Sequence, residues 1–275
     1  MHARFGAMVL LGSWILACAP TAATPGESTE PPVIDAAGAG EAEAPADADA
    51  AGPVGAEAGE VETPTAGAAP QQVELEINQR YEEQTDPEQW ASRFEREGRE
   101  VYDRRDQVLA ELGLRPGMAV ADVGAGTGML TIPLAEAVGP EGRVYAVDVQ
   151  PYFLDHVGQK AREAGLENVE LVRAKQDAVG LPPGSIDLAI MVDVYHHVEK
   201  PAAYLASIHA ALRPEGRLVV IDYRAEEGKS DAWLLEHVRA SPDAFRAELQ
   251  SAGFVMVSTH EGVLEDNFFY ELRLR

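Results

Sequence analysis

The plainest candidates for chemistry lie in a glycine-rich segment, "VADVGAGTG". An apolar run ends at Asp122, and Gly124, Gly126 and Gly128 follow at alternate positions. Glycine lets a backbone turn tightly and approach a bound molecule closely, so this spacing is typical of a loop that holds a nucleotide-like ligand. A dinucleotide-binding loop prefers the spacing G-x-G-x-x-G, but here Met129 stands where its last glycine would be.

Three acidic residues indicate what kind of ligand this loop would hold. A carboxylate at Asp122 is a poor neighbour for a pyrophosphate and a good one for an ammonium or sulfonium cation. Asp148 ends the next apolar stretch, where it can accept two hydrogen bonds from a ribose diol. Asp177 can accept a hydrogen bond from an adenine amino group while the backbone N–H of Ala178 donates to a ring nitrogen. The pattern favours a nucleoside that carries a cation.

Strand-like and helix-like segments alternate from Met118 to the end of the chain. We expect strands at 118–123, 143–149, 169–174, 187–194, 217–223, 254–260 and 267–274, with helices at 127–138, 151–164, 201–212, 231–240 and 243–252. This order predicts an α/β fold with a doubly wound, mostly parallel seven-stranded sheet and helices on both faces. No helix separates the last two strands, so they should form a hairpin that makes one strand antiparallel.

Four stretches in this order resemble the Rossmann-like (class I) S-adenosylmethionine-dependent methyltransferases, in their small-molecule branch. They are "VADVGAGTG", "VYAVDV", "KQDAVGLPPGSIDLAIMVDVYHHV" and "LRPEGRLVVIDY". The resemblance covers about residues 101–275 and implies S-adenosylmethionine as cofactor. It places the methionine part at the glycine loop, the ribose at Asp148 and the adenine at Asp177. The residues expected to bind the cofactor are Asp122, Gly124, Ala125, Gly126, Asp148, Val149, Asp177, Ala178 and Asp193.

Methyl transfer is an in-line displacement, so the protein must position the acceptor, exclude water and in some cases remove a proton. The segment "VDVYHHV" follows the fourth predicted strand and would face the methyl group. Tyr195, His196 and His197 are therefore the candidate catalytic residues, since an imidazole with a near-neutral pKa can act as a base. The alternative is that one histidine packs or orients the loop, as the resemblance also allows. The methyl acceptor is expected to be a small molecule of undetermined structure.

The segment before the sheet, residues 73–113, is predicted to form a helical cap. By the resemblance it would cover the cofactor and contact the acceptor; a solvated helix face is the alternative. Further candidate contacts from the cap and from the ends of late strands are Arg80, Tyr81, Arg99, Tyr102, Tyr223 and Asn267.

Composition excludes several other functions. The formal net charge is -24, whereas a protein that binds duplex nucleic acid needs clustered Lys and Arg, so no nucleic-acid partner is expected. The single cysteine, Cys18, excludes a disulfide within the chain and a multi-cysteine metal site. The histidines are scattered apart from the adjacent pair, so the sequence predicts no metal site. The oligomeric state is left open.

The first 18 residues predict a signal peptide. The apolar run Ala7–Ala17 would reach about 16 Å as a helix, too short for a hydrocarbon core of about 30 Å. Its end, "ILAC", resembles a bacterial lipobox, although Leu16 departs from that pattern. We therefore expect lipidation at Cys18 and a membrane-anchored lipoprotein of the bacterial cell envelope. Ordinary signal cleavage and a cytoplasmic protein are the alternatives.

Residues 19–72 are rich in Ala, Gly, Pro, Glu and Asp and have almost no large apolar side chains, which predicts a disordered linker. The methyltransferase domain would then span residues 73–275. The leading hypothesis is methyl transfer to a small molecule. Because the cofactor is made in the cytoplasm, an exported, non-catalytic binding module on the same fold is one alternative. An NAD-dependent oxidoreductase is another, which the glycine spacing and the terminal hairpin disfavour.

Overall fold

The computed structural model describes the backbone of residues 71–275 and the side chains from residue 77 onward. The predicted signal peptide and all of the predicted linker except its last two residues lie outside the described residues. Helix α1 begins at Gln71, two residues before the predicted domain boundary. Within residues 71–275, no helix is long and apolar enough to cross a membrane.

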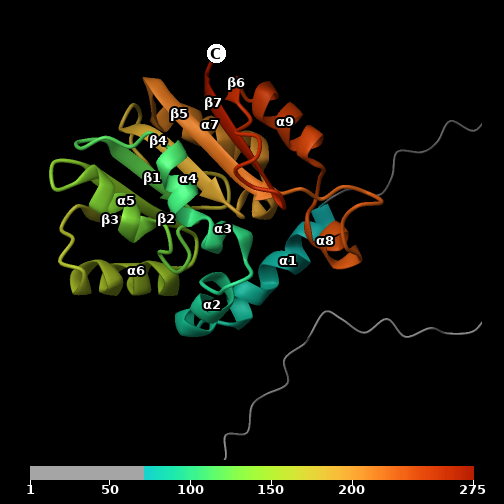
Figure 1. The fold of residues 1–275 in the computed structure, drawn as a ribbon, viewed down its shortest axis with the longest axis horizontal. Coiled ribbons are helices and arrows are strands. Elements are labelled where there is room, and N and C mark those ends of the chain that lie inside the picture. The colour runs from blue at the N-terminus through green and yellow to red at the C-terminus, as the bar shows by residue number, and fades with distance from the viewer. Residues whose placement is uncertain (1–70) are drawn as a thin grey trace, which may run out of the picture. The chain divides into compact units, whose positions relative to one another are not determined.

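Seven strands form one sheet in the order β3-β2-β1-β4-β5-β7-β6 (Figure 1). Strand β7 pairs antiparallel with both of its neighbours, while the pairs among the other five neighbouring strands are parallel. The predicted α/β fold, with its hairpin and its single antiparallel strand, is confirmed. The strands are β1 Ala119–Val123, β2 Arg143–Asp148, β3 Val169–Arg173, β4 Ile186–Val192, β5 Leu212–Tyr223, β6 Phe254–Ser258 and β7 Asn267–Leu274.

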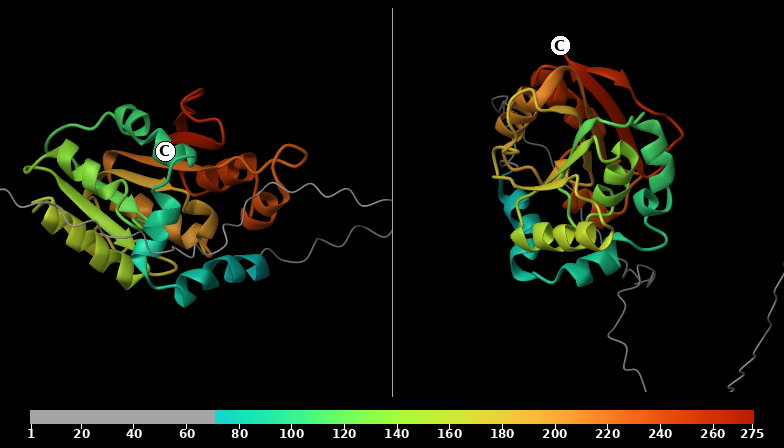
Figure 2. Two further views of the ribbon diagram at one scale, coloured as in Figure 1. Left: turned by 60° about the horizontal axis from the view of Figure 1, so that its bottom comes forward. Right: turned by 90° about the vertical axis from the view of Figure 1, so that its left-hand side faces the viewer.

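Helices cover both faces of the sheet, which therefore forms the middle of three layers (Figure 2). Helices α7 and α9 pack on one face, and α4, α5 and α6 on the other. The helices are α1 Gln71–Glu83, α2 Pro87–Phe94, α3 Glu100–Asp103, α4 Arg105–Glu111, α5 Thr131–Val138, α6 Pro151–Glu163, α7 Pro201–Ala211, α8 Ala232–His237 and α9 Pro242–Ser251, with a 3₁₀ turn η1 at Tyr195–His197.

The central strands are mostly apolar because they are buried on both faces. All five residues of β1 are buried, and alternate side chains enter opposite layers. Val120 packs with α4 and α5, whereas Ala121 and Val123 pack in the layer of α7 and α9. The sheet is therefore a rigid base for the loops that follow its strands.

Two elements differ from prediction next to the carboxyl ends of the strands. Helix α5 begins at Thr131 instead of residue 127, because the three loop glycines adopt positive φ angles that a helix does not allow. Strand β4 ends at Val192 instead of residue 194, because Asp193 has a φ of 52° and turns the chain into η1. Both differences leave more irregular chain at the ligand-binding edge of the sheet than the sequence pattern indicated.

Candidate functional site

A cavity of about 630 Å³ lies at the carboxyl ends of the parallel strands. It is bounded by the glycine loop, by the ends of β2 and β4, by the N-terminal helices and by α8. Its volume falls in the range of sites that bind small molecules. The predicted residues that line it are Gly124, Ala125, Gly126, Asp148, Val149, Asp193, His196, His197, Arg80, Tyr81, Arg99, Tyr223 and Asn267.

The glycine loop crosses directly against the turn that follows β4. Gly124 has a φ of 76°, and a Cβ atom at this position would lie 2.4 Å from a methyl carbon of Val194. The Gly124 N–H donates to the carbonyl of Val147 over 2.7 Å. Gly124 is therefore required both by its backbone conformation and by the close approach of Val194.

We expect Gly124→Ala to lower the free energy of unfolding by about 3 kcal/mol, which combines left-handed strain with overpacking. Gly117→Ala is a matched control, because Gly117 has a φ of 86° and an added Cβ would meet nothing within 4 Å. That control should lose only about 1 kcal/mol. Urea denaturation measures both variants, and equal losses would show that Val194 does not restrict the loop.

Asp148, at the end of β2, joins the glycine loop to the start of α6. Its Oδ2 accepts a hydrogen bond from the N–H of Gly126 over 2.9 Å, and its Oδ1 accepts one from the N–H of Gln150 over 2.8 Å. Burial raises the pKa of Asp148 to about 6, against the lowering effect of these backbone donors. The carboxylate lines the cavity, so its remaining acceptor positions are available to a ribose diol.

Asp122 occupies a different position from the one predicted for it. It is 4% exposed, does not line the cavity, and accepts a hydrogen bond from the hydroxyl of Thr131 over 2.6 Å. Burial raises the pKa of Asp122 to about 6, because a charged carboxylate loses its solvation there. Its observed contact ties the end of β1 to the first turn of α5.

The raised pKa makes the effect of Asp122 on stability depend on pH. Between pH 4 and pH 6 the folded chain holds a proton that the unfolded chain has lost, so the charged carboxylate lowers stability as pH rises. The free energy of unfolding of Asp122→Asn should therefore rise, relative to that of the natural protein, by about 3 kcal/mol from pH 4 to pH 7. Denaturation across this range measures it, with the exposed Asp155→Asn as control; a pH-independent difference would contradict it.

The segment after β3 reaches the cavity through a different residue from the two that were predicted. Asp177 is exposed and Ala178 half-buried, and neither lines the cavity, whereas Gln176 does. The N–H of Ala178 donates to the carbonyl of Lys175 over 3.3 Å, which closes a tight turn. In this structure Gln176, rather than Asp177, is the polar side chain of this turn at the cavity.

The cavity fits the predicted cofactor in its polar groups. Thr127 is 1% exposed and lines the cavity, and its hydroxyl has no hydrogen-bond partner in the described part of the chain. Buried hydroxyls are normally paired, so this one is available to a ligand's carboxylate or amine. Asp148 would hold the ribose, and Thr127 with the loop backbone would hold the amino-acid end.

Asp193 forms a buried ion pair across the cavity wall. Its carboxylate lies 2.6 Å from a guanidinium nitrogen of Arg99 and also accepts a hydrogen bond from the Asn267 side chain over 2.6 Å. Burial raises the pKa of Asp193, and the Arg99 charge opposes this rise. The contact joins the N-terminal helices to the end of β4 and the start of β7.

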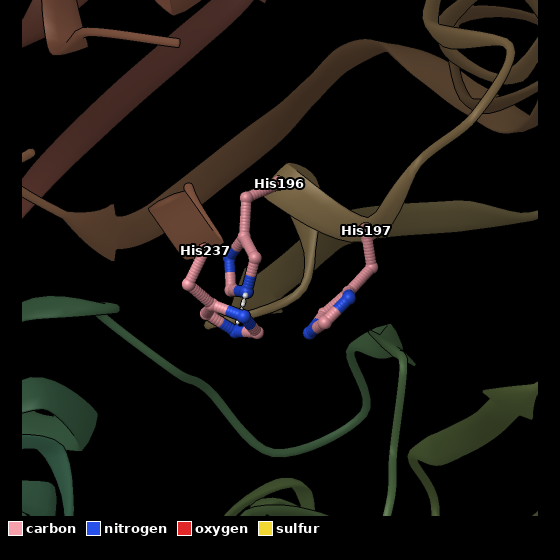
Figure 3. Close-up of side chains that lie close together, drawn as sticks. All are labelled: His196, His197 and His237. Atoms are coloured by element: carbon pink, nitrogen blue, oxygen red, sulfur yellow. Dashed lines mark hydrogen bonds between the residues drawn. The ribbon is translucent and has the colours of Figure 1, made fainter. Parts of the chain in front are cut away.

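Three histidines converge at one end of the cavity, and we call them the imidazole cluster: His196, His197 and His237 (Figure 3). The Nδ1 of His196 lies 2.7 Å from Oδ1 of Asp222, and its Nε2 lies 3.2 Å from Nε2 of His237. Burial lowers the pKa of His197 well below its usual value and that of His237 to about 4. Both imidazoles are neutral near pH 7.

Tyr195, the third candidate catalytic residue, is turned away from this cluster. Its side chain is fully buried, and its hydroxyl donates to Glu248 on α9 over 2.7 Å. It packs edge-on against Phe245 and does not line the cavity. The structure therefore places Tyr195 in the core, because the 3₁₀ turn directs successive side chains in different directions. Tyr102 also lies outside the cavity lining.

An aromatic wall lines the cavity and consists of Tyr81, Trp90, Phe94 and Phe153. Tyr81 and Trp90 stack with ring centroids 4.7 Å apart, and Trp90 stacks on Phe94 at 5.4 Å. Tyr81 also meets the His197 ring edge-on at 5.3 Å. The helices α1 and α2 thus cover the cavity with flat apolar surfaces, which suit a ring-bearing ligand.

The sequence pattern indicated Tyr81 but did not reveal the rest of the aromatic wall, nor His237, Asp222 or Asn78, as parts of the site. His237 is 40 positions from His197 and lies on a six-residue helix, so no spacing connects it to the pair. Asp222 directly follows a run of apolar residues in β5, and an acidic residue at such a position was a signal of function in the sequence. The structure shows that its side chain is 0% exposed.

Comparisons with known proteins agree with this geometry. Residues 114–267 match a family described as "Methyltransferase domain". The chain is 30% identical over 123 residues to the ubiquinone/menaquinone biosynthesis C-methyltransferase UbiE of Marinomonas sp. (strain MWYL1), covering 44% of this chain and 49% of that one. For the corresponding protein of Klebsiella pneumoniae (strain 342), the identity is 28%, covering 54% and 70%. The chain thus spans about half the length of the first relative.

A solved structure extends the similarity to nearly a whole protein. The S-adenosylmethionine-dependent methyltransferase from Aquifex aeolicus has a TM-score of 0.58 and 28% identity, covering 68% of this chain and 96% of that one. The family match spans more than half of the present chain and includes β1 to β6 and the glycine loop. The chain therefore belongs to the methyltransferase domain family, and its cofactor is S-adenosylmethionine.

Proposed function

We propose that the chain transfers a methyl group from S-adenosylmethionine to a small, ring-bearing acceptor that loses a proton on methylation. The observation that carries this proposal is the enclosure of one cavity by both the cofactor-binding residues and the imidazole cluster. Helices α1 and α2 cover that cavity, so an acceptor must fit beside the cofactor within about 630 Å³. Such a space favours a small molecule over a folded protein or a nucleic acid.

The aromatic wall supports a flat acceptor. Tyr81, Trp90 and Phe94 form a stacked series that can pack against a ring. The relatives of this chain are named as C-methyltransferases of ubiquinone and menaquinone biosynthesis, which supports a ring-bearing acceptor. A hydroxylated aromatic or quinol-like ring is therefore the acceptor class that we propose.

The mechanism needs positioning and the loss of one proton. When bound, S-adenosylmethionine supplies an activated methyl group on a sulfonium centre. Asp148 and the glycine loop hold the donor, while the aromatic wall orients the acceptor ring toward it. The acceptor's proton leaves beside the imidazole cluster.

The test measures release of S-adenosylhomocysteine by the full chain with S-adenosylmethionine and a panel of acceptors. The panel contains hydroxylated aromatic and quinol compounds, an unstructured peptide and duplex DNA. We expect turnover with the ring compounds alone. Turnover with peptide or DNA, or cofactor binding without turnover on any ring compound, would contradict the proposal; the latter result would favour a non-catalytic binding module.

We also propose that the chain is exported and anchored through a lipid on Cys18. The apolar run and the "ILAC" sequence support this location. Mass spectrometry of the N-terminus of the native protein tests it. A diacylglyceryl-modified Cys18 is expected, and an intact Met1 in the soluble fraction would refute the anchor.

A further inference from the structure

We propose that the imidazole cluster is a binding site for a divalent transition-metal ion of the Zn²⁺ class, held by the Nε2 atoms of His196, His197 and His237. One ligand atom from each of these residues lies within 4.8 Å of those of the other two. The three rings come from two separate elements, η1 and α8, and point toward a common centre (Figure 3). This proposal goes beyond the proposed methyl transfer and does not depend on the identity of the acceptor.

The distances suit such an ion. Zn²⁺ bonds to imidazole nitrogen at about 2.0–2.1 Å, so two ligands in a tetrahedral site are about 3.4 Å apart. The Nε2 atoms of His196 and His237 are 3.2 Å apart. The ligand atom of His197 lies within 4.8 Å of the other two. His237 is half-buried on a short helix, so modest side-chain movements would bring all three atoms to bonding distance of one ion.

The ring nitrogen of His196 that faces away from the cluster makes the kind of contact that metal-binding histidines make. Its Nδ1 donates to the carboxylate of Asp222, which is 0% exposed, and this bond leaves the Nε2 lone pair facing the cluster. Histidines that bind metals in proteins typically donate their other ring N–H to a carboxylate, a carbonyl or a water. The buried negative charge of Asp222 also favours a cation nearby.

His197 is oriented in the same way by a neutral partner. Its Nδ1 lies 2.9 Å from Oδ1 of Asn78. The Asn78 Nδ2 donates to the His197 carbonyl and to Glu199, each over 3.0 Å, so its amide oxygen faces the ring. Nδ1 of His197 therefore donates the proton, and its Nε2 carries the lone pair. The Tyr81 hydroxyl lies 3.4 Å from this Nε2, and an ion bound there would displace that long contact.

Three imidazole ligands without a thiolate suit Zn²⁺, Co²⁺, Ni²⁺ or Cu²⁺ better than Mg²⁺ or Ca²⁺. Three protein ligands leave one position open in a tetrahedral site, as in catalytic zinc sites. All three histidines line the cavity, so an acceptor hydroxyl could bind at that position and lose its proton more readily to solvent. In the ion-bound form, the metal, instead of the imidazoles, would promote the loss of the acceptor's proton.

One group opposes the ion. A guanidinium nitrogen of Arg80 lies 3.4 Å from Nδ1 of His237, where its positive charge repels a cation. Arg80 is exposed, so its side chain can move into solvent when His237 binds an ion through Nε2 and carries its proton on Nδ1. Arg80→Gln should therefore tighten metal binding, by about three- to tenfold.

The experiment titrates the metal-stripped full chain with Zn²⁺ by calorimetry and with Co²⁺ by visible absorption. Neither readout requires cofactor or acceptor, so this proposal can fail while the proposed methyl transfer stands. We expect one equivalent per chain and an intense, tetrahedral Co²⁺ spectrum. His237→Ala should weaken Zn²⁺ binding at least 100-fold, and Asp222→Asn 10- to 100-fold. His209→Ala, a half-buried histidine of α7 outside the cavity, is the matched control and should bind as the natural protein does.

Circular dichroism confirms that each variant is folded before titration. A chain that takes up no stoichiometric Zn²⁺ at micromolar concentrations would overturn the proposal. Uptake that His237→Ala leaves unchanged would also overturn it, because the acidic surface would then be the site of binding. A Co²⁺ spectrum of octahedral type would exclude the three-histidine geometry.

Discussion

Replacing Arg99 with methionine should lower the free energy of unfolding by about 3 kcal/mol at pH 8. Methionine keeps much of the apolar stem of Arg99 but removes the guanidinium that lies 2.6 Å from Asp193. The Asp193 side chain is 5% exposed, so its carboxylate would remain buried with only the Asn267 amide as a partner. A buried charge without its counter-ion is more costly than the intact pair.

The Arg99→Met effect should shrink as the pH falls. The Arg99 charge opposes the raised pKa of Asp193, so its removal should raise this pKa further. A raised pKa means that the folded variant takes up a proton more readily than the unfolded chain, so stability lost at pH 8 returns toward acidic pH. Urea denaturation at pH 8 and pH 5.5 measures the change.

The double variant Arg99→Met with Asp193→Asn tests the cause. Asparagine tolerates the positive φ of 52° at position 193 and carries no charge, so it should restore most of the lost stability. A loss below 1 kcal/mol for Arg99→Met, or no recovery in the double variant, would show that the ion pair is not the source. If stability is lost and the double variant does not recover it, the packing contacts of the guanidinium would explain the loss.

Replacing Asp148 with alanine should weaken the binding of S-adenosylmethionine at least about 100-fold. Two hydrogen bonds from a ribose diol to a carboxylate contribute about 1.5–3 kcal/mol each, and the variant loses both. It also removes the acceptor for the N–H of Gly126, which loosens the glycine loop. Calorimetry with S-adenosylmethionine and S-adenosylhomocysteine measures the loss.

The pH dependence of binding gives an independent check on Asp148. Because burial raises the pKa of Asp148 to about 6, the affinity of the natural protein should fall as the pH drops below that value. Asp148→Asn cannot change its charge, so its weaker affinity should be nearly constant over the same range. Asp177→Ala, which alters an exposed residue outside the cavity lining, should change affinity less than threefold. Equal losses at positions 148 and 177 would contradict the structure's placement of these residues.

The glycine loop and the ends of the strands were predictable because they depend on local rules. Alternate glycines after an apolar run predict a turn at the carboxyl edge of a sheet, and Gly124, Gly126 and Asp148 do line the cavity there. Boundaries were less predictable, because Asp193 adopts a positive φ that residues other than glycine seldom show. Asp122 was expected beside the ligand, yet its burial depends on how α5 packs over β1.

The sequence alone determined the α/β class, the terminal hairpin and the position of the cofactor loop. These follow from the order of apolar and amphipathic segments and from the glycine spacing, which are local properties of the chain. Only the tertiary structure decided which side chains share the cavity. It brought His237 to the pair at 196–197, placed Asp222 behind them, and turned Tyr195 into the core. These contacts join residues that are up to 53 positions apart, and they follow from the packing of helices that no local pattern specifies.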